Sequence, residues 1–330
     1  MTEAKRSLPP AVAFVLTRYL PCSALALVML TALGWLPMLF VGLPVLAFLV
    51  SIFAITLNML TPALFALIFI GGGMRYVLQV GAFVTLVVVG LSDFDVLLGI
   101  WVGLFYCLLP VFAARHLKRI GGVNRSAVHL VIVMIFATLV SLLMGAQSQG
   151  VSIETWVGQW LEPMFASMKM QAGGVSGQGL KEVKHMLVWM LPGFIAFSFW
   201  LVWWFDVLLA RKIAMRYGFY KGDTADMLQL HVDKWLAYGL MLSLIFANLA
   251  SGTLQYIAVS IGLVLAGVLA MQGIAVAHVW LKVRGMQVAI VVMYVLLFLW
   301  FMMVIPFIIL GMLDIWFDYR RNISPSVGGK

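Results

Sequence analysis

Long stretches without any ionisable side chain constrain this chain more than any other feature of its sequence. The 56 residues between Arg18 and Arg75 contain no Asp, Glu, Lys, Arg or His. Similar runs recur along the rest of the chain, at 76–92, 96–114, 130–153, 186–205, 235–277 and 285–313. A helix needs about 20 apolar residues to cross the hydrocarbon core of a bilayer, so each run predicts at least one membrane-spanning segment.

The composition and these runs together predict an all-α fold. Hydrophobic residues make up 64% of the chain and charged residues only 10%, which excludes a soluble enzyme and a secreted disulfide scaffold. Backbone groups in lipid require helices or a closed barrel, and the runs lack the period-two alternation of barrel strands. We expect one integral membrane domain over residues 1–330, a polytopic transmembrane helical bundle with about nine spans, within a range of eight to ten.

Two of the runs are long enough for two crossings each. They are 19–74, which is broken by Pro37, Pro44 and Pro62, and 235–277, which has a predicted turn at Ser251-Gly252-Thr253. The number of crossings between residues 19 and 74 stays open, because a short re-entrant piece is compatible with the same prolines.

The net charge of +9 follows the positive-inside rule and does not form a patch for nucleic acid. Lys and Arg are concentrated in three loops, 115–125, 211–234 and 281–285. The loop at Asp93 and Asp95 is acidic, so we expect the basic loops in the cytoplasm and the others outside. The side of the C-terminus is open, because nine spans place Arg320 and Arg321 outside and eight place them inside.

The longest loop, 148–185, balances acidic and basic residues and contains one amphipathic segment. Helical spacing relates five of its residues, Trp156, Trp160, Met164, Phe165 and Met168, and a glycine-rich connector follows at 172–179. The pattern is typical of a helix that lies in the membrane interface. We expect an extracytoplasmic loop that is either a linker resting on the membrane or a lid over a cavity that opens outward.

Small residues define a helix-packing face in the run 235–277. Six positions fall within about 120° of one helix face, namely Ala258, Gly262, Ala266, Ala270, Gly273 and Ala277. Gly99 and Gly103 form a second, shorter pair. Small side chains let membrane helices approach closely. Such faces pack either inside the bundle or against another membrane protein, and the sequence leaves that choice open.

Ionisable residues near spans are the first candidates for a binding site, because placing them in lipid is costly. Arg75 follows Gly71-Gly72-Gly73, which predicts either a tight cytoplasmic turn or a broken helix that presents Arg75 to an anionic solute. Asp206 ends an aromatic run, and Arg211 and Lys212 lie just beyond it. We expect Asp206 to be an interface residue paired with a nearby cation, with a proton or solute site as the alternative.

The end of the last run carries the most informative polar cluster. On a continuous helix, Asp314, Asp318 and Arg321 share one face at spacings of four and three. Two carboxylates at this spacing repel each other and oppose the helix dipole, so we expect Arg321 to offset Asp318 and Asp314 to have a partner elsewhere. His278 ends the small-residue span and is expected to be a hydrogen-bonded interface residue. These four residues, with Arg75 and Asp206, are the candidate substrate-binding residues.

No catalytic or metal-binding pattern accompanies these candidates in the sequence. Four residues of metal-binding type share the loop 211–234 without a recognised ligand spacing, namely Asp223, Asp226, His231 and Asp233. Motifs of phosphate-binding loops, nucleophile elbows and zinc proteases do not occur. Cys22 and Cys107 are expected to act as small hydrophobic residues. We therefore expect no enzyme activity, no metal and no cofactor.

Several of these residues resemble a family pattern. Gly273, His278 and Lys282, then a long apolar span, then Leu310-Gly311, Asp314, Phe317-Asp318 and Arg320-Arg321 resemble the YybS-like family of predicted bacterial membrane proteins (domain of unknown function 2232). The stretch from Pro62 through Gly71-Gly72-Gly73 to Tyr76 is similar to that family's early Pro-then-Gly pattern. The resemblance covers about 235–321 well and 20–115 loosely, and the loop 148–185 departs from it. It implies a helical fold in the bacterial inner membrane and, distantly, similarity to the substrate-binding subunits of energy-coupling-factor transporters.

Two functions from different classes remain open. In the first, the chain is a multi-pass inner-membrane protein that binds or transports a small solute such as a vitamin or metabolite, with Arg75 and the loop 148–185 near an outward cavity. Its partner would then be an ATP-driven transport module. In the second, it is a non-transporting membrane scaffold or assembly partner that binds another membrane protein through its small-residue helix faces. Both functions place the chain in the lipid bilayer without nucleic acid.

Overall fold

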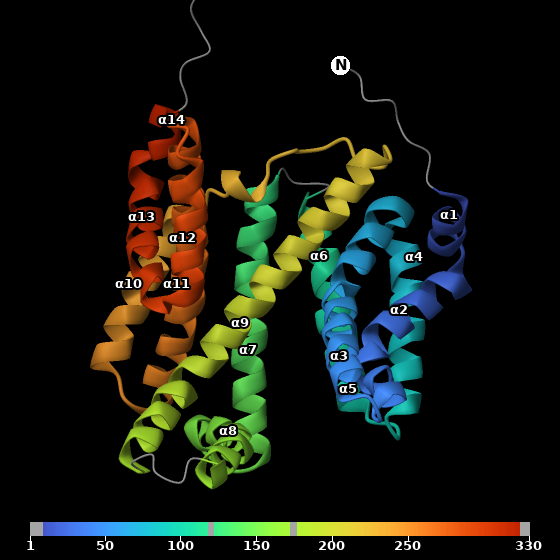
Figure 1. Ribbon diagram of the computed structural model, residues 1–330, viewed down its shortest axis with the longest axis horizontal. Coiled ribbons are helices and arrows are strands. Elements are labelled where there is room, and N and C mark those ends of the chain that lie inside the picture. Colours follow the sequence, from blue (N-terminus) through green and yellow to red (C-terminus); the bar gives the residue numbers. More distant parts are fainter. Residues whose placement is uncertain (1–8, 118–121, 172–176, 324–330) are drawn as a thin grey trace, which may run out of the picture. The chain divides into compact units, whose positions relative to one another are not determined.

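A computed structural model of the protein describes residues 9–117, 122–171 and 177–323. These residues form helices and no strand (Figure 1), so the all-α prediction is confirmed. The chain groups into two compact units, unit 1 with residues 1–130 and 201–224, and unit 2 with residues 131–200 and 225–330. Two long helices contribute to both units, α7 (Val123–Ser148) and α9 (Gly177–Arg216). The sequence did not predict this division.

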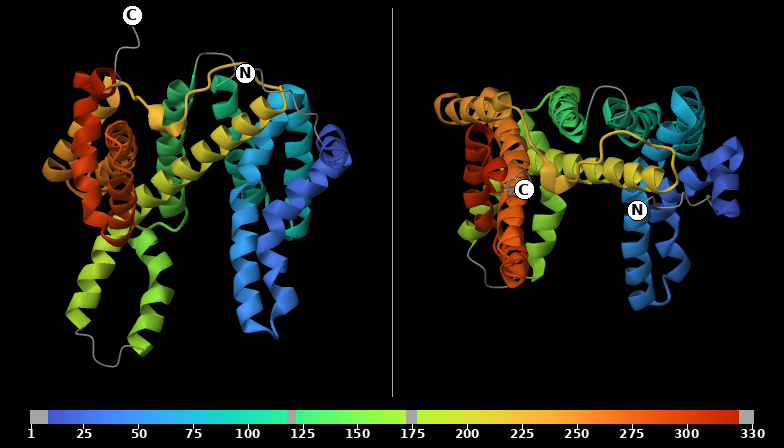
Figure 2. Two further views of the ribbon diagram at one scale, coloured as in Figure 1. Left: turned by 45° about the horizontal axis from the view of Figure 1, so that its top comes forward. Right: turned by 90° about the horizontal axis from the view of Figure 1, so that it is seen from above.

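Unit 1 contains most of the N-terminal helices. They are α1 (Pro10–Thr17), α2 (Tyr19–Trp35), η1 (Pro37–Phe40), α3 (Pro44–Met59), α4 (Thr61–Leu91), α5 (Val96–Val102), the π-helix η2 (Gly103–Leu108) and α6 (Leu109–His116). α2 and α3 lie side by side (Figure 2), and Asn58 of α3 donates from Nδ2 to the Leu30 carbonyl of α2 at 2.7 Å. Pro62 lies in the first turn of α4, where a missing N–H costs no helical hydrogen bond.

α4 folds back on itself at Gly73. Gly73 has φ 80° and ψ −177°, a conformation that is essentially restricted to glycine. A Cβ placed on Gly81 would lie 3.8 Å from Cε1 of Phe65, whereas a straight helix would separate these two residues by about 24 Å. α4 is therefore a helical hairpin. Arg75 is exposed in the first turn after the reversal.

Unit 2 is built around one long helix, α11 (Gly252–Val283). The other elements are α8 (Ile153–Gln171), η4 (Met227–Gln229), α10 (Lys234–Leu249), α12 (Gln287–Leu299), η5 (Phe301–Met303), α13 (Val304–Phe317) and α14 (Tyr319–Ile323). α11 packs most extensively against α13 and α10. The predicted turn between residues 251 and 253 is confirmed, because α11 begins at Gly252 with φ 63°.

The small-residue face of α11 packs inside unit 2. A Cβ on Gly273 would lie 1.9 Å from the Phe307 carbonyl oxygen of α13, and a Cβ on Gly311 would lie 1.9 Å from the Leu269 carbonyl oxygen of α11. The two backbones therefore touch at this crossing. Gly99 and Gly103 likewise face Val89 and Thr85 of α4 within unit 1. At Gly273, Gly99 and Gly103, these faces thus contact helices of the same chain.

The predicted amphipathic helix is α8, and one of its faces packs inside unit 2. The buried residues recur every four positions, at Ile153, Val157, Leu161 and Phe165, and join a hydrophobic cluster with Leu142, Val188 and Tyr256. Trp160 and Met164 are exposed. Of the predicted apolar residues, Phe165 is buried in this cluster and Trp156 packs against it. The position of α8 in the membrane interface stays a prediction. The Met168 side chain and residues 172–176 of the connector lie outside the described structure.

Nine spans are not confirmed. Within the described residues, five helical stretches are long and apolar enough to cross a membrane, and a sixth forms if the bent pair α12 and α13 is one span. α2 and α10 are apolar but shorter, with 17 and 16 residues. Prolines and glycines divide the charge-free runs into shorter helices, as at Pro37 and Gly73.

Candidate functional site

Two helix irregularities bring polar groups together in the apolar interior of unit 1. The first is the break at Leu60 between α3 and α4, and the second is the π-helix η2. Tyr106 of η2 donates its hydroxyl to Oδ1 of Asn58 at 2.9 Å. Trp203 of α9 donates Nε1–H to the Phe105 carbonyl at 2.5 Å. π-helical turns are rare and occur frequently at functional sites, because they leave backbone carbonyls free for other donors.

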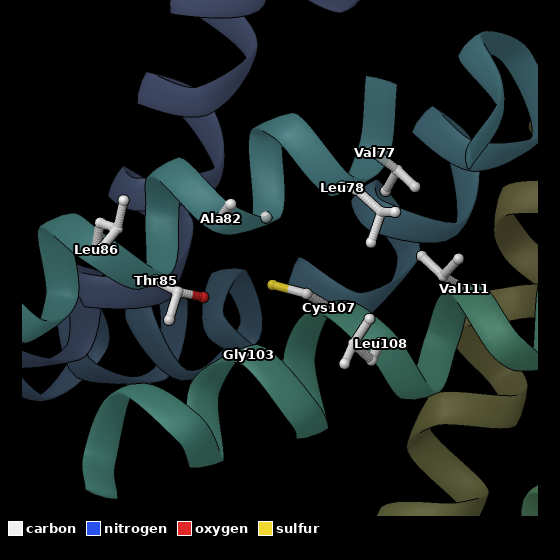
Figure 3. Close-up of a pocket in the computed structure, with 10 residues that line it drawn as sticks. Val77, Leu78, Ala82, Thr85, Leu86, Gly103, Cys107, Leu108 and Val111 are labelled. Atoms are coloured by element: carbon white, nitrogen blue, oxygen red, sulfur yellow. The ribbon is translucent and has the colours of Figure 1, made fainter. Parts of the chain in front are cut away.

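A cavity of about 410 Å³ lies against the same π-helix (Figure 3). It lies between the second half of α4 and the helices η2 and α6. The lining residues are Val77, Leu78, Gly81, Ala82, Thr85, Leu86, Gly103, Cys107, Leu108 and Val111. The Thr85 hydroxyl and the Cys107 thiol project into the space, and the remaining lining is apolar. The cavity thus suits a small, mainly apolar molecule.

Asp206 lies in the same unit, buried to 1% exposure on α9. Its Oδ2 has no hydrogen-bond partner within the described part of the chain, and its carboxylate faces the backbone N–H of Ala63 in the first turn of α4. The predicted pairing with a nearby cation was wrong. Arg211 points elsewhere, and its Nη1 donates to the Asp223 carbonyl at 3.1 Å, because five positions along a helix place the two side chains on different faces.

Asp223 connects the segment that follows α9 to the start of α7. Its Oδ2 accepts from the Val123 backbone N–H at 3.0 Å, and the nearby Tyr220 hydroxyl donates to the Leu117 carbonyl at 3.2 Å. Burial raises the pKa of Tyr220. Within the described residues, no three His, Cys, Asp or Glu side chains gather in a way that could hold a metal ion.

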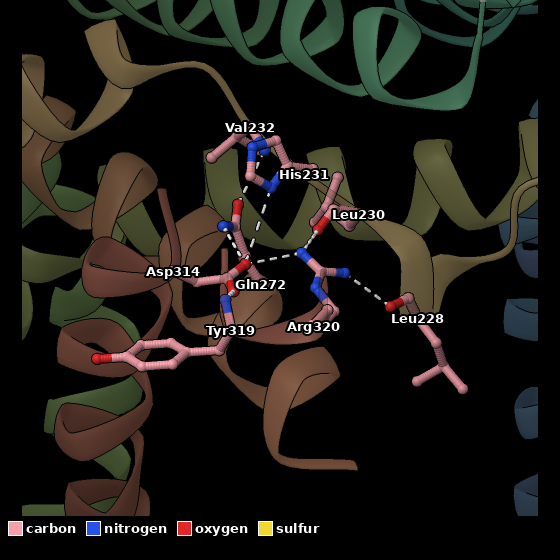
Figure 4. A network of polar contacts seen from close by, with 8 residues as sticks. All are labelled: Leu228, Leu230, His231, Val232, Gln272, Asp314, Tyr319 and Arg320. Carbon is pink, nitrogen blue, oxygen red and sulfur yellow. Dashed lines mark hydrogen bonds and ion pairs between the residues drawn. The ribbon is translucent and has the colours of Figure 1, made fainter. Parts of the chain in front are cut away.

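In unit 2, the buried carboxylate of Asp314 is the centre of a polar network (Figure 4). Oδ2 accepts from Nε2 of Gln272 at 2.9 Å and from Nη2 of Arg320 at 2.9 Å, and Oδ1 accepts from the Tyr319 backbone N–H at 3.0 Å. Nδ1 of His231 lies 3.8 Å from Oδ2. The carboxylate is thus neutralised and hydrogen-bonded on both oxygens, which is what a buried charge requires.

The same network holds the segment before α10. Arg320 donates from Nη1 to the Leu228 carbonyl at 2.8 Å and from Nη2 to the Leu230 carbonyl at 2.6 Å. Gln272 accepts the Val232 backbone N–H at 2.8 Å through Oε1. The network therefore connects α11, α13, α14 and the loop that precedes α10. These contacts are all made with groups of the chain itself, which indicates that the network stabilises the fold of unit 2.

The prediction that Asp314, Asp318 and Arg321 share a helix face was wrong. α13 ends at Phe317, and Asp318 adopts a left-handed conformation with φ 44°. This one residue ends the helical register, so Arg320 and not Arg321 reaches Asp314. Asp318 and Arg321 are exposed. The prediction that Asp314 needs a partner elsewhere is confirmed, but Gln272, His231 and Arg320 were missed as its partners.

The remaining candidates do not join either cluster. His278 lies near the end of α11, and its Nδ1 is 3.1 Å from the Tyr294 hydroxyl of α12, as expected for a hydrogen-bonded residue. A second cavity, of about 330 Å³, adjoins the Gly73 reversal and is lined by Gly71, Gly72 and Tyr76, among others, but not by Arg75. The six candidate residues therefore fall into separate places, with Arg75 and Asp206 in unit 1 and the other four in unit 2.

Comparison with known proteins adds one finding. The model of a family described as a predicted membrane protein matches residues 38–315. No match was found among curated proteins, and none among solved structures. The matched range includes the hairpin α4, the π-helix, Asp206 and the α11–α13 crossing.

Proposed function

Because the chain belongs to the DUF2232 family of predicted membrane proteins, we propose that it is a multi-pass membrane protein that binds a small lipophilic solute in unit 1. The family resemblance seen in the sequence is thereby confirmed, whereas the distant similarity to energy-coupling-factor subunits stays a prediction. The observation that carries the proposal is the cavity beside the π-helix. Its volume of about 410 Å³ lies in the range of about 300–1,000 Å³ that is usual for small-molecule sites.

The surface around the cavity supports a solute that enters from lipid. Leu78, Leu86 and Leu108 line the cavity and are exposed, so its rim continues into the apolar surface that membrane helices present to hydrocarbon. Thr85 and Cys107 supply the two polar groups inside. A mainly apolar lining with a few polar groups is the usual composition of sites that bind and orient small molecules.

The scaffold alternative has less support. It relied on the small-residue faces at Gly99, Gly103 and along α11, and these faces contact α4 and α13 within the same chain. A partner protein would have to displace those helices. The solute-binding proposal needs no such rearrangement, since the cavity is already formed.

A cavity-filling variant tests the proposal. Ala82→Phe places a ring in the cavity, whereas Ala24→Phe adds the same ring at an exposed position of α2 that does not line it. Native mass spectrometry of the detergent-extracted protein should show a bound small molecule in the wild type and in Ala24→Phe, and a strong loss of it in Ala82→Phe. Fat-soluble vitamins or free fatty acids should raise the Tm of the wild type and of Ala24→Phe, and should raise the Tm of Ala82→Phe much less. Equal occupancy in both variants would refute a site in this cavity.

For the cellular setting, we propose the bacterial inner membrane, with the basic loops in the cytoplasm. The activity we propose is binding, or transport together with an ATP-driven module, and not catalysis. Reporter fusions after residue 330 determine the side of the C-terminus, and copurification of an ATPase with the full chain tests the module.

A further inference from the structure

We propose that Asp206 is a proton-binding site, in which the side chain carries a proton on Oδ2 inside the apolar part of unit 1. This inference goes beyond the solute-binding proposal and does not depend on it. It starts from a carboxyl group that the rest of the fold leaves incompletely satisfied. Ionisable residues within membrane spans are costly and are often functional, including as proton relays.

Burial makes the ionised form of Asp206 costly. Asp206 is 1% exposed, and Oδ2 has neither accessible surface nor a hydrogen-bond partner in the described structure. An ionised carboxylate without water or a counter-charge is far more costly to bury than a neutral carboxylic acid. A metal cation or an organic amine needs volume next to the oxygen, whereas a proton needs none.

The charged groups of the described neighbouring elements do not neutralise Asp206. No nitrogen of Lys, Arg or His lies within 4.0 Å of Asp206 among the described residues. Arg211 on the same helix is bound to the Asp223 carbonyl. The charged residue of α4, Arg75, is exposed beyond the reversal at Gly73.

The π-helix beside α9 carries two titratable groups, the Cys107 thiol, which faces the cavity, and Tyr106, whose hydroxyl is occupied by Asn58. Its ring lies 5.5 Å from that of Trp203, three residues before Asp206 on α9. The side chains packed around this part of α9 therefore supply no cation. This contrasts with Asp314, where Arg320 neutralises an equally buried carboxylate.

The hydrogen bonding available to Asp206 fits a neutral carboxylic acid. Ala63 offers its backbone N–H from the first turn of α4, where helical N–H groups lack partners in their own helix. The Ala63 N–H satisfies one oxygen of the Asp206 carboxyl group. A neutral acid uses that oxygen as its carbonyl acceptor and carries the proton on Oδ2, whereas a carboxylate would leave several lone pairs on both oxygens unsatisfied. The geometry thus fits the protonated form.

The test uses the full-length protein in lipid nanodiscs and infrared spectroscopy at neutral pH. The wild type should show a C=O stretching band of a protonated carboxylic acid that shifts in deuterated water. Asp206→Asn should lose this band, because the amide keeps a carbonyl acceptor for Ala63 but has no acid proton. Asp318→Asn, at an exposed carboxylate, is the matched control and should retain it.

A second measurement follows from linkage. If the folded protein holds one proton on Asp206 that the unfolded chain releases at neutral pH, stability falls as pH rises, by up to tenfold in the folding equilibrium constant per pH unit. Asp206→Asn should lack this contribution, and Asp318→Asn should keep it. A wild-type spectrum without the band, or a band that survives in Asp206→Asn, would overturn the proposal. If Asp206→Asn does not fold, a wild-type spectrum without the band is sufficient to overturn the proposal.

Discussion

Replacing Gly273 by alanine should destabilise unit 2, because α11 and α13 touch there backbone to backbone. The added Cβ would lie 1.9 Å from the Phe307 carbonyl oxygen, where ordinary contacts begin at 3.4 Å. Relieving the clash requires a shift of about 1.5 Å between the helices, and overpacking of this kind costs about 1–3 kcal/mol. A backbone atom is the obstacle, so rotation of a flexible side chain cannot absorb the strain.

The same shift also acts on the neighbouring polar network. Gln272 adjoins Gly273, and its Nε2 lies 2.9 Å from Oδ2 of Asp314 on the facing helix. A separation of about 1.5 Å breaks this bond and leaves buried polar atoms unsatisfied, which costs a further ~1–3 kcal/mol. The better helix propensity of alanine offsets about 1 kcal/mol. We therefore expect a net loss of about 3 kcal/mol, which lowers the Tm by roughly 5–10 °C.

Thermal unfolding of the detergent-purified protein, followed by size-exclusion chromatography, measures this loss. Gly34→Ala is the matched control, since a Cβ at this position of α2 meets nothing within 4 Å. Its Tm should stay equal to that of the wild type or rise slightly. A Gly273→Ala protein as stable as Gly34→Ala would refute the direct backbone contact and the coupling to Asp314.

Two further substitutions test other parts of the fold. Asp314→Asn leaves Arg320 without its counter-charge, and removing one member of a buried pair costs about 3–5 kcal/mol. A Tm unchanged from the wild type would show that the Asp314 network does not stabilise unit 2. Gly73→Ala forces a side chain onto φ 80° and should cost about 1–3 kcal/mol. Gly71→Ala, which meets no atom within 4 Å, is its control, and equal stability of both variants would contradict the reversal in α4.

The helical pattern within single segments could be predicted from the sequence. The small-residue face of α11, the turn at Gly252 and the reversal after the three glycines all depend on local periodicity or on backbone conformations that glycine adopts easily. The amphipathic helix α8 was also predicted, but its orientation was not. Which of its faces is buried depends on the shapes of α7, α9 and α11, and these shapes are not encoded in the spacing within α8.

The candidate site was much less predictable, because it depends on residues distant in the chain. Arg320 bonds to the Leu228 carbonyl across 92 positions, and Gln272 bonds to Asp314 across 42. The helical spacing favoured Arg321, and one left-handed residue, Asp318, changed the outcome. The apolar cavity in unit 1 likewise forms between the second half of α4 and the helices η2 and α6, so no single motif indicates it.

By itself, the sequence determined that this protein is a helical membrane protein of one family, because hydrophobic runs and the scarcity of charges leave the bilayer as the only compatible solvent. The tertiary structure alone decided what each buried carboxyl group experiences. Asp314 and Asp206 each directly follow an apolar run, yet one meets Arg320 and the other meets only a backbone N–H. Electrostatic energy in a medium of low polarity depends on distances of a few ångströms, and those distances are set by packing between segments that are remote in the chain.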